Sequence, residues 1–376
     1  MSRRYQATGT RQQASGGEDA RTRGRGDTGT GGWRGKGTRK RGDAEHSGLS
    51  TRDSALGTRH PALLVLLLAV LAAAVLGCAA QPAAKPAAPI KVGVLPILDA
   101  LPMYVAEQEG YFQEGGVQVE LVLFPSALER DSAFMAGQVD GLLNDPISVG
   151  LLNKDGEKAK MVRLAFKGNE SMAMMVVLAS PNSKIASPTD LKGVPIGISS
   201  NSIIEYTTER LLQRAGLKPS DIQETEVTKI PVRAEMLAKG QLQAATLPEP
   251  LASLAVQQGA RVILDDSKTG TGQSVITFRQ ETVSDNAEGI RRFLAAYEKG
   301  VQAINSTPNR YRDLMVDKAK VPDSLRDSLN VPRFESAQLP AKADVEDVMN
   351  WMVEKKLLDK PIPYEKQVAE GLLPKP

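Results

Sequence analysis

Residues 90–124 read IKVGVLPILDALPMYVAEQEGYFQEGGVQVELVLF: a short apolar run, a helical period, then a second run of alternating residues. The runs at 90–96 and 117–124 have the period of strands, and the stretch between them, 101–116, has the period of a helix that stops at two glycines. The same alternation of strand and helix patterns continues to about residue 285, beyond which the pattern is helical. The sequence therefore predicts an α/β fold.

Two segments of this pattern resemble each other. MAGQVDGLLNDP (135–146) and LAKGQLQAATLPEP (237–250) each contain a helix end, Gly-Gln, an apolar strand, and an acid followed by proline. Because Gly-Gln is a common helix stop, coincidence is one explanation, and duplication of a supersecondary unit is the other. The 299 residues from Cys78 to Pro376 suffice for two lobes with separate cores.

The composition excludes several classes of function. Residues 1–60 carry 13 Lys/Arg against 6 Asp/Glu, whereas the chain after Cys78 carries 34 against 38, so its body has no basic footprint for nucleic acid. His46 and His60 are the only histidines and Cys78 is the only cysteine. The body therefore cannot build a serine–histidine triad, a cysteine–histidine pair or a usual zinc site. Chemistry by carboxylates alone stays open, but we expect no enzyme activity, no catalytic residue, no metal and no cofactor.

The segment before the body is a predicted secretory signal. Residues 59–77 join a cationic start to the apolar stretch PALLVLLLAVLAAAVLG, which is short for a membrane span. It ends in Val-Leu-Gly before Cys78, which resembles a bacterial lipobox and implies cleavage there with diacylation of Cys78. An uncleaved membrane helix with an incidental cysteine is the alternative.

Low-complexity segments flank this signal. Residues 78–89 alternate alanine and proline and predict an extended tether between membrane and body. Residues 1–58 are rich in Arg, Gly, Thr and Ser and predict a disordered basic extension, which is explained most simply by a misassigned start codon.

Several segments of the body together resemble a known family. DALPMYVAEQEGYFQEGGVQVELV, FMAGQVDGLLND, DLKGVPIGIS, ERLLQRAGLKPSDI, LAKGQLQAATLPEP and QGARVI follow one another in this order. They resemble the SsuA/THI5-like (NMT1-type) binding proteins of ABC importers over residues 90–360, with some likeness to methionine-binding lipoproteins of the NlpA type. No single motif is diagnostic, but the order and spacing of the segments together are a strong signal.

The resemblance implies a type II periplasmic-binding-protein fold, in which two α/β lobes close on a ligand in the cleft between them. Lobe one would comprise residues 90–178 and 275–376, lobe two residues 179–274, with crossover hinges near 178–181 and 270–276. The chain would be a monomer on the extracytoplasmic face of the cell membrane, held by its lipid and delivering a small solute to an ABC permease and ATPase. Two alternatives stay open: a sensory ligand-binding lipoprotein without transport, and a pyrimidine-synthesis-type enzyme on the same fold.

Candidate ligand-binding residues follow from a general rule. In α/β lobes, ligands bind beyond the carboxyl ends of strands, where helix N-termini offer free N–H groups. Serine and asparagine also cap helices, and acids before prolines also fix turns, so each candidate has a structural explanation too. The candidates at such positions are Leu98, Asp99, Ser126, Asn144, Asp145, Ser200, Asn201, Ser202 and Glu249.

The chemistry of these candidates leaves the class of solute open. Hydroxyls and helix N-termini at 199–202 suit an anion such as a sulfonate, nitrate or carboxylate. Asp99, Asp145 and Glu249 suit an amine or a protonated heterocycle. Because carboxylates outnumber arginines among the candidates, the sequence favours a nitrogen-bearing organic solute.

Overall fold

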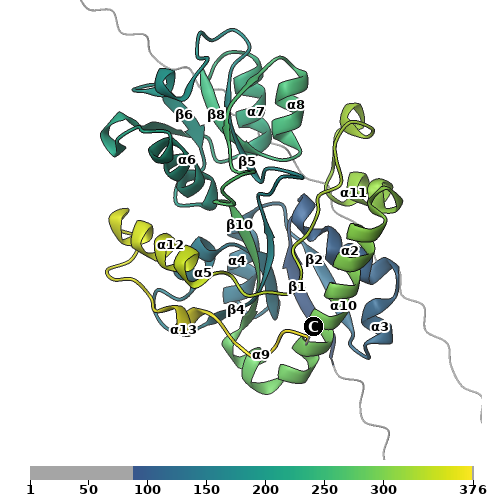
Figure 1. Ribbon diagram of the computed structural model, residues 1–376. Coiled ribbons are helices and arrows are strands. Elements are labelled where there is room, and N and C mark those ends of the chain that lie inside the picture. The colour runs from purple at the N-terminus through teal and green to yellow at the C-terminus, as the bar shows by residue number, and fades with distance from the viewer. Residues whose placement is uncertain (1–87, 375–376) are drawn as a thin grey trace, which may run out of the picture. The chain divides into compact units, whose positions relative to one another are not determined.

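Two five-stranded sheets organise residues 88–374, the part of the chain that the computed structural model describes (Figure 1). The strand order is β2-β1-β3-β10-β4 in the first sheet and β7-β6-β8-β5-β9 in the second. β10 runs antiparallel to both of its neighbours, as does β5 in the second sheet. The strands are β1 (Ile90–Val94), β2 (Val119–Leu123), β3 (Gly141–Asn144), β4 (Ala159–Lys167), β5 (Met175–Ala179), β6 (Pro195–Ile198), β7 (Gln223–Glu226), β8 (Ala244–Pro248), β9 (Arg261–Asp265) and β10 (Gln273–Arg279).

Helices cover both faces of each sheet, which confirms the predicted α/β class. In the second sheet, α6 lies on one side and α7 with α8 on the other (Figure 1). The α-helices are α2 (Leu101–Gln108), α3 (Tyr111–Glu114), α4 (Ala127–Met135), α5 (Pro146–Leu152), α6 (Ile203–Arg214), α7 (Ile230–Ala238), α8 (Leu251–Gln257), α9 (Gln280–Asp285), α10 (Ala287–Ser306), α11 (Arg312–Lys318), α12 (Lys342–Glu354) and α13 (Tyr364–Gln367). Short 3-10 helices are η1 (Leu98–Ala100), η2 (Pro188–Leu191), η3 (Pro219–Asp221), η4 (Pro308–Tyr311) and η5 (Asp323–Leu325).

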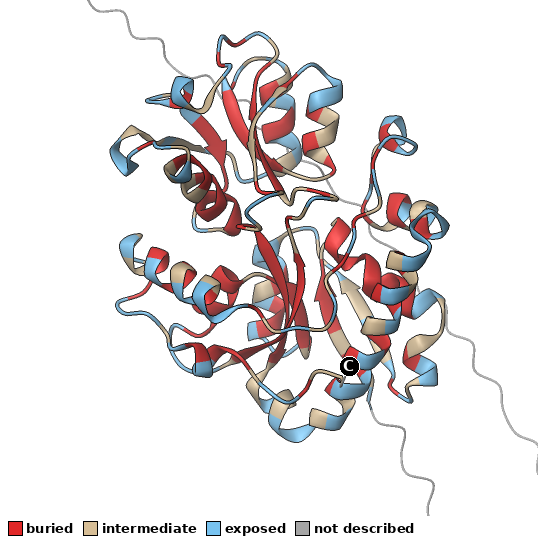
Figure 2. Cartoon of the chain, in the orientation of Figure 1, coloured by how far each residue is buried: buried red, intermediate tan, exposed pale blue. Residues whose placement is uncertain are grey.

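The interior strand β5 is buried on both faces, so its sequence, MVVLA, is apolar throughout rather than alternating. All five residues of β5 and eight of the nine in β4 are buried (Figure 2). The C-terminal helices supply much of the cover: α10 presents a buried stripe that includes Ile290, Phe293, Tyr297 and Val301 at helical spacing. This stripe joins the core cluster that also contains α2 and β1.

The predicted helix over 101–116 is two helices. Gly110 adopts a left-handed backbone conformation, with φ of 76°, and separates α2 from α3. A residue without Cβ adopts this conformation at no steric cost, so the chain turns here before the two glycines at 115–116 that the sequence analysis took as the helix end.

The predicted lobe boundaries need correction. β5 pairs with β8 and β9, so residues 175–179 belong to the second sheet, not to lobe one. The first crossover is therefore 168–174 instead of 178–181, and the second is 266–272, since β10 already begins at Gln273. The turn-rich stretch after residue 180 lies within lobe two. A strand buried on both faces has the same apolar sequence in either lobe, so its pattern could not assign it. We use lobe one for 88–167 with 273–374, and lobe two for 175–265.

A buried carboxylate joins the two crossovers. Asp266 is fully buried, and its Oδ1 accepts the backbone N–H groups of Met174 (2.8 Å) and Met175 (3.0 Å) from the end of the first crossover. Its Oδ2 accepts the N–H of Gly272 (2.9 Å) at the end of the second crossover. Loss of hydration raises the pKa of Asp266 to about 6, although these three hydrogen bonds act to lower it. Three backbone N–H groups therefore donate to this one carboxylate, which ties the ends of the two crossovers together.

Within residues 88–374 the structure contains no helix with the length and apolarity needed to cross a membrane. The predicted extension 1–58, the signal 59–77, the lipidation site Cys78 and most of the tether lie outside the described residues.

Candidate ligand-binding site

The carboxyl ends of the parallel strands in the two lobes are turned toward each other. β4 leaves the first sheet at the edge where β1 and β3 also end, because all three run in the same direction. The crossover from β4 enters β5 at the edge of the second sheet where β6 and β8 end, because β5 is antiparallel to β8. The loops that follow β1, β3, β6 and β8 therefore lie on the sides of the two sheets that face the crossovers, which is the position the rule for α/β lobes predicts for a ligand.

In lobe one, Asp99 combines burial with an unpaired oxygen. It lies in η1, 6% exposed, and its Oδ2 has no hydrogen-bond partner in the described part of the chain. Burial raises the pKa of Asp99, while the charge of Arg130 acts to lower it. Leu98 beside it is 3% exposed and belongs to the core cluster with β1 and α2, so the structure accounts for it as a core residue.

The other lobe-one candidates make local hydrogen bonds. Asp145 is the N-cap of α5 and accepts the N–H groups of Ile147 and Ser148 at 3.0 Å each, yet desolvation raises its pKa to about 6. Asn144 is buried between Ser148 and Thr277, donating to one hydroxyl and accepting from the other.

Ser126 is the N-cap of α4. It accepts the N–H of Glu129 and donates its hydroxyl to the Glu129 carboxylate. Helix capping accounts for this serine, although its position at the end of β2 leaves a contact with ligand open.

In lobe two, the loop after β6 presents the predicted polar run. Ser202 is the N-cap of α6: its hydroxyl accepts the N–H of Ile204 and donates to the carbonyl of Ser199 (2.6 Å). Asn201 is exposed, with a left-handed φ of 58°, and its N–H donates to the carboxylate of Glu205. Ser200 between them is half-buried. Capping therefore accounts for one of the three, and two remain for other contacts.

Glu249 follows β8 at the position equivalent to Asp145 in lobe one. Its carboxylate accepts the N–H (3.2 Å) and the hydroxyl (3.0 Å) of Ser253. Desolvation raises its pKa. Asp99, Asp145 and Glu249 thus share one property: each carboxyl group at these strand ends is desolvated without a cation in direct contact within residues 88–374. A protonated nitrogen on a solute would offset that cost.

Sequence reasoning missed two arginines near these loops. Arg130 on α4 is 2% exposed and donates to the carbonyl of Leu143 at the end of β3. Arg233 on α7 is fully buried and donates to Ser199 and Val227, which follow β6 and β7. The resemblance between residues 135–146 and 237–250 could have pointed to both, because each arginine stands seven residues before the glycine of its Gly-Gln pair.

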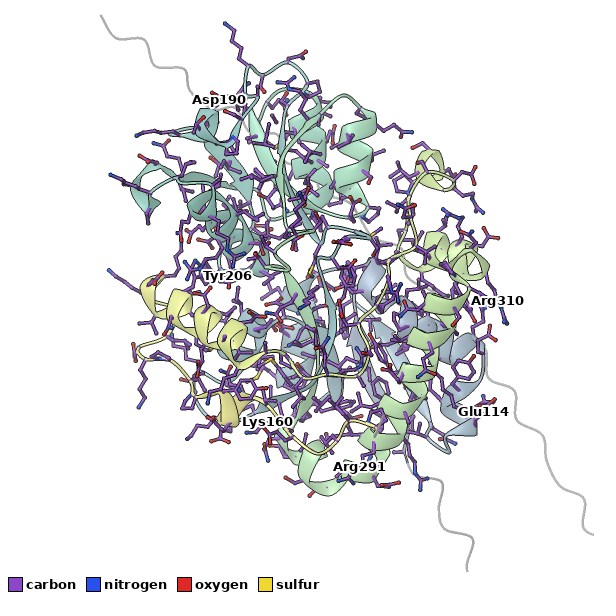
Figure 3. The ribbon with its side chains drawn as sticks, in the orientation of Figure 1. Glu114, Lys160, Asp190, Tyr206, Arg291 and Arg310 are labelled. Atoms are coloured by element: carbon purple, nitrogen blue, oxygen red, sulfur yellow. The ribbon has the colours of Figure 1, made fainter. Side chains whose placement is uncertain are left out.

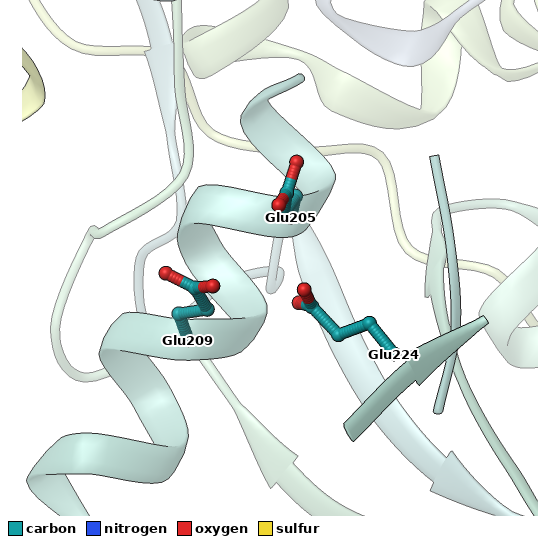
Figure 4. A group of neighbouring side chains, drawn as sticks. All are labelled: Glu205, Glu209 and Glu224. Carbon is teal, nitrogen blue, oxygen red and sulfur yellow. The ribbon is translucent and has the colours of Figure 1, made fainter. Parts of the chain in front are cut away.

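A cluster of acids connects this site to a contact between the lobes. Glu205 and Glu209 on α6 and Glu224 on β7 point toward one another (Figure 4). The ammonium of Lys355, at the end of α12 in lobe one, pairs with Glu205, with Glu209 (2.9 Å) and more distantly with Glu224 (3.8 Å). The protein's own cation therefore takes the place that a metal ion would need. Desolvation and the charges of Glu209 and Glu205 raise the pKa of Glu224 to about 8.

The same two helices meet at a second point. The hydroxyl of Tyr206 on α6 donates to Asp347 on α12 (2.7 Å), and Arg210 donates to the same carboxylate (2.9 Å); Tyr206 lies between the helices (Figure 3). The indole N–H of Trp351 donates to Glu209 (2.6 Å). Because Glu205 also accepts the N–H of Asn201, the loop after β6 is linked through α6 to lobe one.

Known proteins with this architecture bear on what the site does. The family model described as NMT1/THI5 like matches residues 98–311. A protein of Brucella abortus (strain 2308) that is named as a binding protein is 23% identical over 260 residues, covering 66% of this chain and 79% of its own. The periplasmic aliphatic sulphonate binding protein SsuA of Escherichia coli superposes with a TM-score of 0.63 at 20% identity, over 77% of this chain and 94% of its own. The desulfurization enzyme DSZB superposes with a TM-score of 0.55 at 15% identity, over 75% and 97%.

The structural likenesses confirm the periplasmic-binding-protein fold that the sequence analysis expected. The likeness to methionine-binding lipoproteins stays a prediction. The family model covers more than half of the chain and includes Leu98 and Asp99 after β1 and the loops after β3, β6 and β8. This chain therefore belongs to the NMT1/THI5-like family.

Proposed function

We propose that this chain is the extracytoplasmic solute-binding component of an ABC importer, and that it captures a small organic solute by closing its two lobes. The observation that carries the proposal is that the loops after β1 and β3 in lobe one and those after β6 and β8 in lobe two face each other across two short crossovers. A solute that contacts both sets binds the closed arrangement more tightly than the open one, and so shifts the population toward closure. The importer's permease would then recognise the closed form.

The proposed solute carries a protonated nitrogen. Asp99 supports this feature most directly, because its Oδ2 is buried without a partner in the described residues and its carboxyl group is desolvated. Asp145 lies at the end of the neighbouring strand β3 and is desolvated as well. An ammonium or pyridinium group between them would restore the electrostatic stabilisation that both acids lack.

A binding role is better supported than catalysis. Because DSZB is an enzyme with a similar fold, catalysis is the alternative to consider. However, residues 79–376 contain neither histidine nor cysteine, so a thiol nucleophile or an imidazole base would have to come from elsewhere. The acids near the site lie beside structural hydrogen-bond donors, which suits the recognition of a charged group.

Calorimetry and small-angle scattering test the proposal together. Amines, protonated heterocycles, sulfonates and amino acids are titrated into the full chain, and a ligand should reduce the radius of gyration as the lobes close. Asp99→Asn keeps the shape of the side chain and removes its charge, so we expect at least about tenfold weaker binding of a nitrogen-bearing ligand, about 1.4 kcal/mol. Asp190→Asn, in a capping box on η2 away from the strand ends, is the matched control. Binding without any change in the scattering profile would contradict closure, and no binding in any class would contradict the proposed function.

The membrane attachment is a separate part of the proposal. Cys78 would carry the lipid, as its lipobox-like context suggests. Replacing Cys78 with Ala should move the protein from the membrane fraction to the extracytoplasmic soluble fraction without changing its affinity for solute. Retention in the membrane fraction would contradict the anchor.

A further inference from the structure

Arg130 and Arg233 occupy equivalent positions in the two lobes. Arg130 lies in the first turns of the helix that follows β2, and Arg233 in the first turns of the helix that follows β7, each four residues after the N-cap. β1 stands between β2 and β3 in lobe one, and β6 stands between β7 and β8 in lobe two; all four pairings are parallel, and β1 and β6 each carry a glycine next to the arginine. A Cβ on Gly93 would lie 3.2 Å from Cγ of Arg130, and one on Gly197 would lie 3.3 Å from Cγ of Arg233. The two side chains thus cross their sheets in the same way.

The two arginines differ in how their charge is neutralised. Arg130 Nε donates to the carboxylate of Asp131, the next residue, at 2.8 Å. Arg233 has Ala234 in that position, and within residues 88–374 no carboxylate lies within ion-pair distance of its guanidinium. Nη1 of Arg233 donates to the Ser199 hydroxyl (2.9 Å) and the Val227 carbonyl (3.0 Å), which are both uncharged. Its Nε and Nη2 are buried without a partner among the described residues.

This arrangement has a cost in the absence of an anion. Burial lowers the pKa of Arg233 to about 10, which is still far enough above neutral pH to leave the side chain charged. A buried charge without a counter-ion is strongly unfavourable, and a ligand that brought the opposite charge would offset this cost. The guanidinium contacts Ser199, and Ser199 is followed directly by half-buried Ser200 and exposed Asn201 in the predicted ligand loop.

We infer that Arg233 recognises an acidic group on the solute, a carboxylate, sulfonate or phosphonate, which takes the place that Asp131 takes beside Arg130. The inference rests on the proposed function and narrows its solute to a zwitterion. The protonated nitrogen would lie against Asp99 and Asp145 in lobe one, and the acidic group against Arg233 in lobe two. A solute with one charge for each lobe would also favour closure, since only the closed form brings both partners to it.

Ala234→Asp tests the inference by supplying the missing carboxylate from within the chain, and Ala234→Asn is its uncharged control of equal size. Titration calorimetry of the full chain uses 2-aminoethanesulfonate, β-alanine and 2-aminoethylphosphonate, with ethylamine and ethanolamine as amines of matched size that lack the acid. We expect the acid-bearing probes to bind the wild type more tightly than the amines. Ala234→Asp should weaken them at least tenfold, and Ala234→Asn less than threefold.

A second variant and a thermal melt keep the test decisive if Ala234→Asp folds poorly. Arg233→Gln should weaken the acid-bearing probes more than the amines, whereas a purely structural role would weaken both alike. Ala234→Asp should also melt at a higher temperature than Ala234→Asn, because its carboxylate pairs with the guanidinium. Tight binding of amines alone, or equal effects of Asp and Asn at position 234, would overturn the inference and leave the proposed function intact. Binding of no probe in either class would count against both.

Discussion

Removing the ammonium of Lys355 should strongly destabilise the protein at neutral pH. Lys355→Met keeps the length and apolar stem of the side chain, but leaves the acid cluster on α6 and β7 without its cation. Lys355 itself is 29% exposed at its side chain, Glu205 is 5% exposed and Glu209 is 14% exposed. The pairs are therefore closer to buried ion pairs, whose disruption costs about 3–5 kcal/mol, than to surface pairs worth about 0–1 kcal/mol. We expect a loss of about 3 kcal/mol in the free energy of unfolding at pH 7.5.

The pH dependence of this loss identifies its cause. Although burial acts to lower it, hydrogen bonds with Glu205 and Glu209 raise the pKa of Lys355 above its usual 10.5. A raised pKa in the folded state means that its ion pairs contribute fully below pH 10.5, so the full effect is present at pH 7.5. In the variant, the negative charge of the acid cluster is uncompensated, and proton binding at lower pH reduces that charge. The loss should therefore shrink to about 1 kcal/mol at pH 5.

Urea unfolding at pH 7.5 and pH 5 measures both values. Lys342→Met is the matched control on the same helix, because the ion pairs that Lys342 forms with Glu365 and Glu346 are exposed and their loss should have no measurable effect. A Lys355→Met variant within 1 kcal/mol of the wild type at pH 7.5, or one whose loss is the same at both pH values, would refute the argument.

Three further outcomes follow from other contacts. Asp266→Asn should lower the free energy of unfolding by about 2 kcal/mol at pH 7.5, because the amide NH₂ would then face a backbone N–H whose hydrogen bond the carboxylate accepts in the wild type. Asp265→Asn is the control in urea unfolding, and equal effects of the two variants would contradict the role of Asp266. The raised pKa of Glu224, about 8, means that its contribution to stability is complete below pH 4.5 and is lost as the pH rises through 8, so the wild type should melt at a lower temperature at pH 8.5 than at pH 6.5. Glu224→Gln should flatten this dependence, and an unchanged slope would show that other groups cause it. Gly300→Ala should destabilise by about 2 kcal/mol, because the added Cβ would lie 2.5 Å from the carbonyl oxygen of Pro102 where α10 packs on α2; a melting temperature equal to that of the wild type would show that the helices can separate.

Much of the architecture could be predicted from local pattern. Strand periods located β1 and β2 within a few residues, and the repeated Gly-Gln segment anticipated that β3 and β8 stand at equivalent places in the two sheets. The lobe boundary could not be predicted in the same way, because β5 is apolar on both faces and its sequence would suit either sheet. The break at Gly110 was missed because a single glycine in a helical pattern is often tolerated.

The sequence by itself determined the class of fold, the family resemblance and the loops where a solute should bind, because each depends on periodicity and order along the chain. Only the tertiary structure decided which polar residues in those loops are already occupied, as Asn144 is by Thr277, and which are not, as with Asp99. It also showed that Arg233 lacks the carboxylate that Arg130 has. The physical reason is that a charge is neutralised by whatever lies near it in space, and the partners of Lys355 are more than a hundred residues away along the chain.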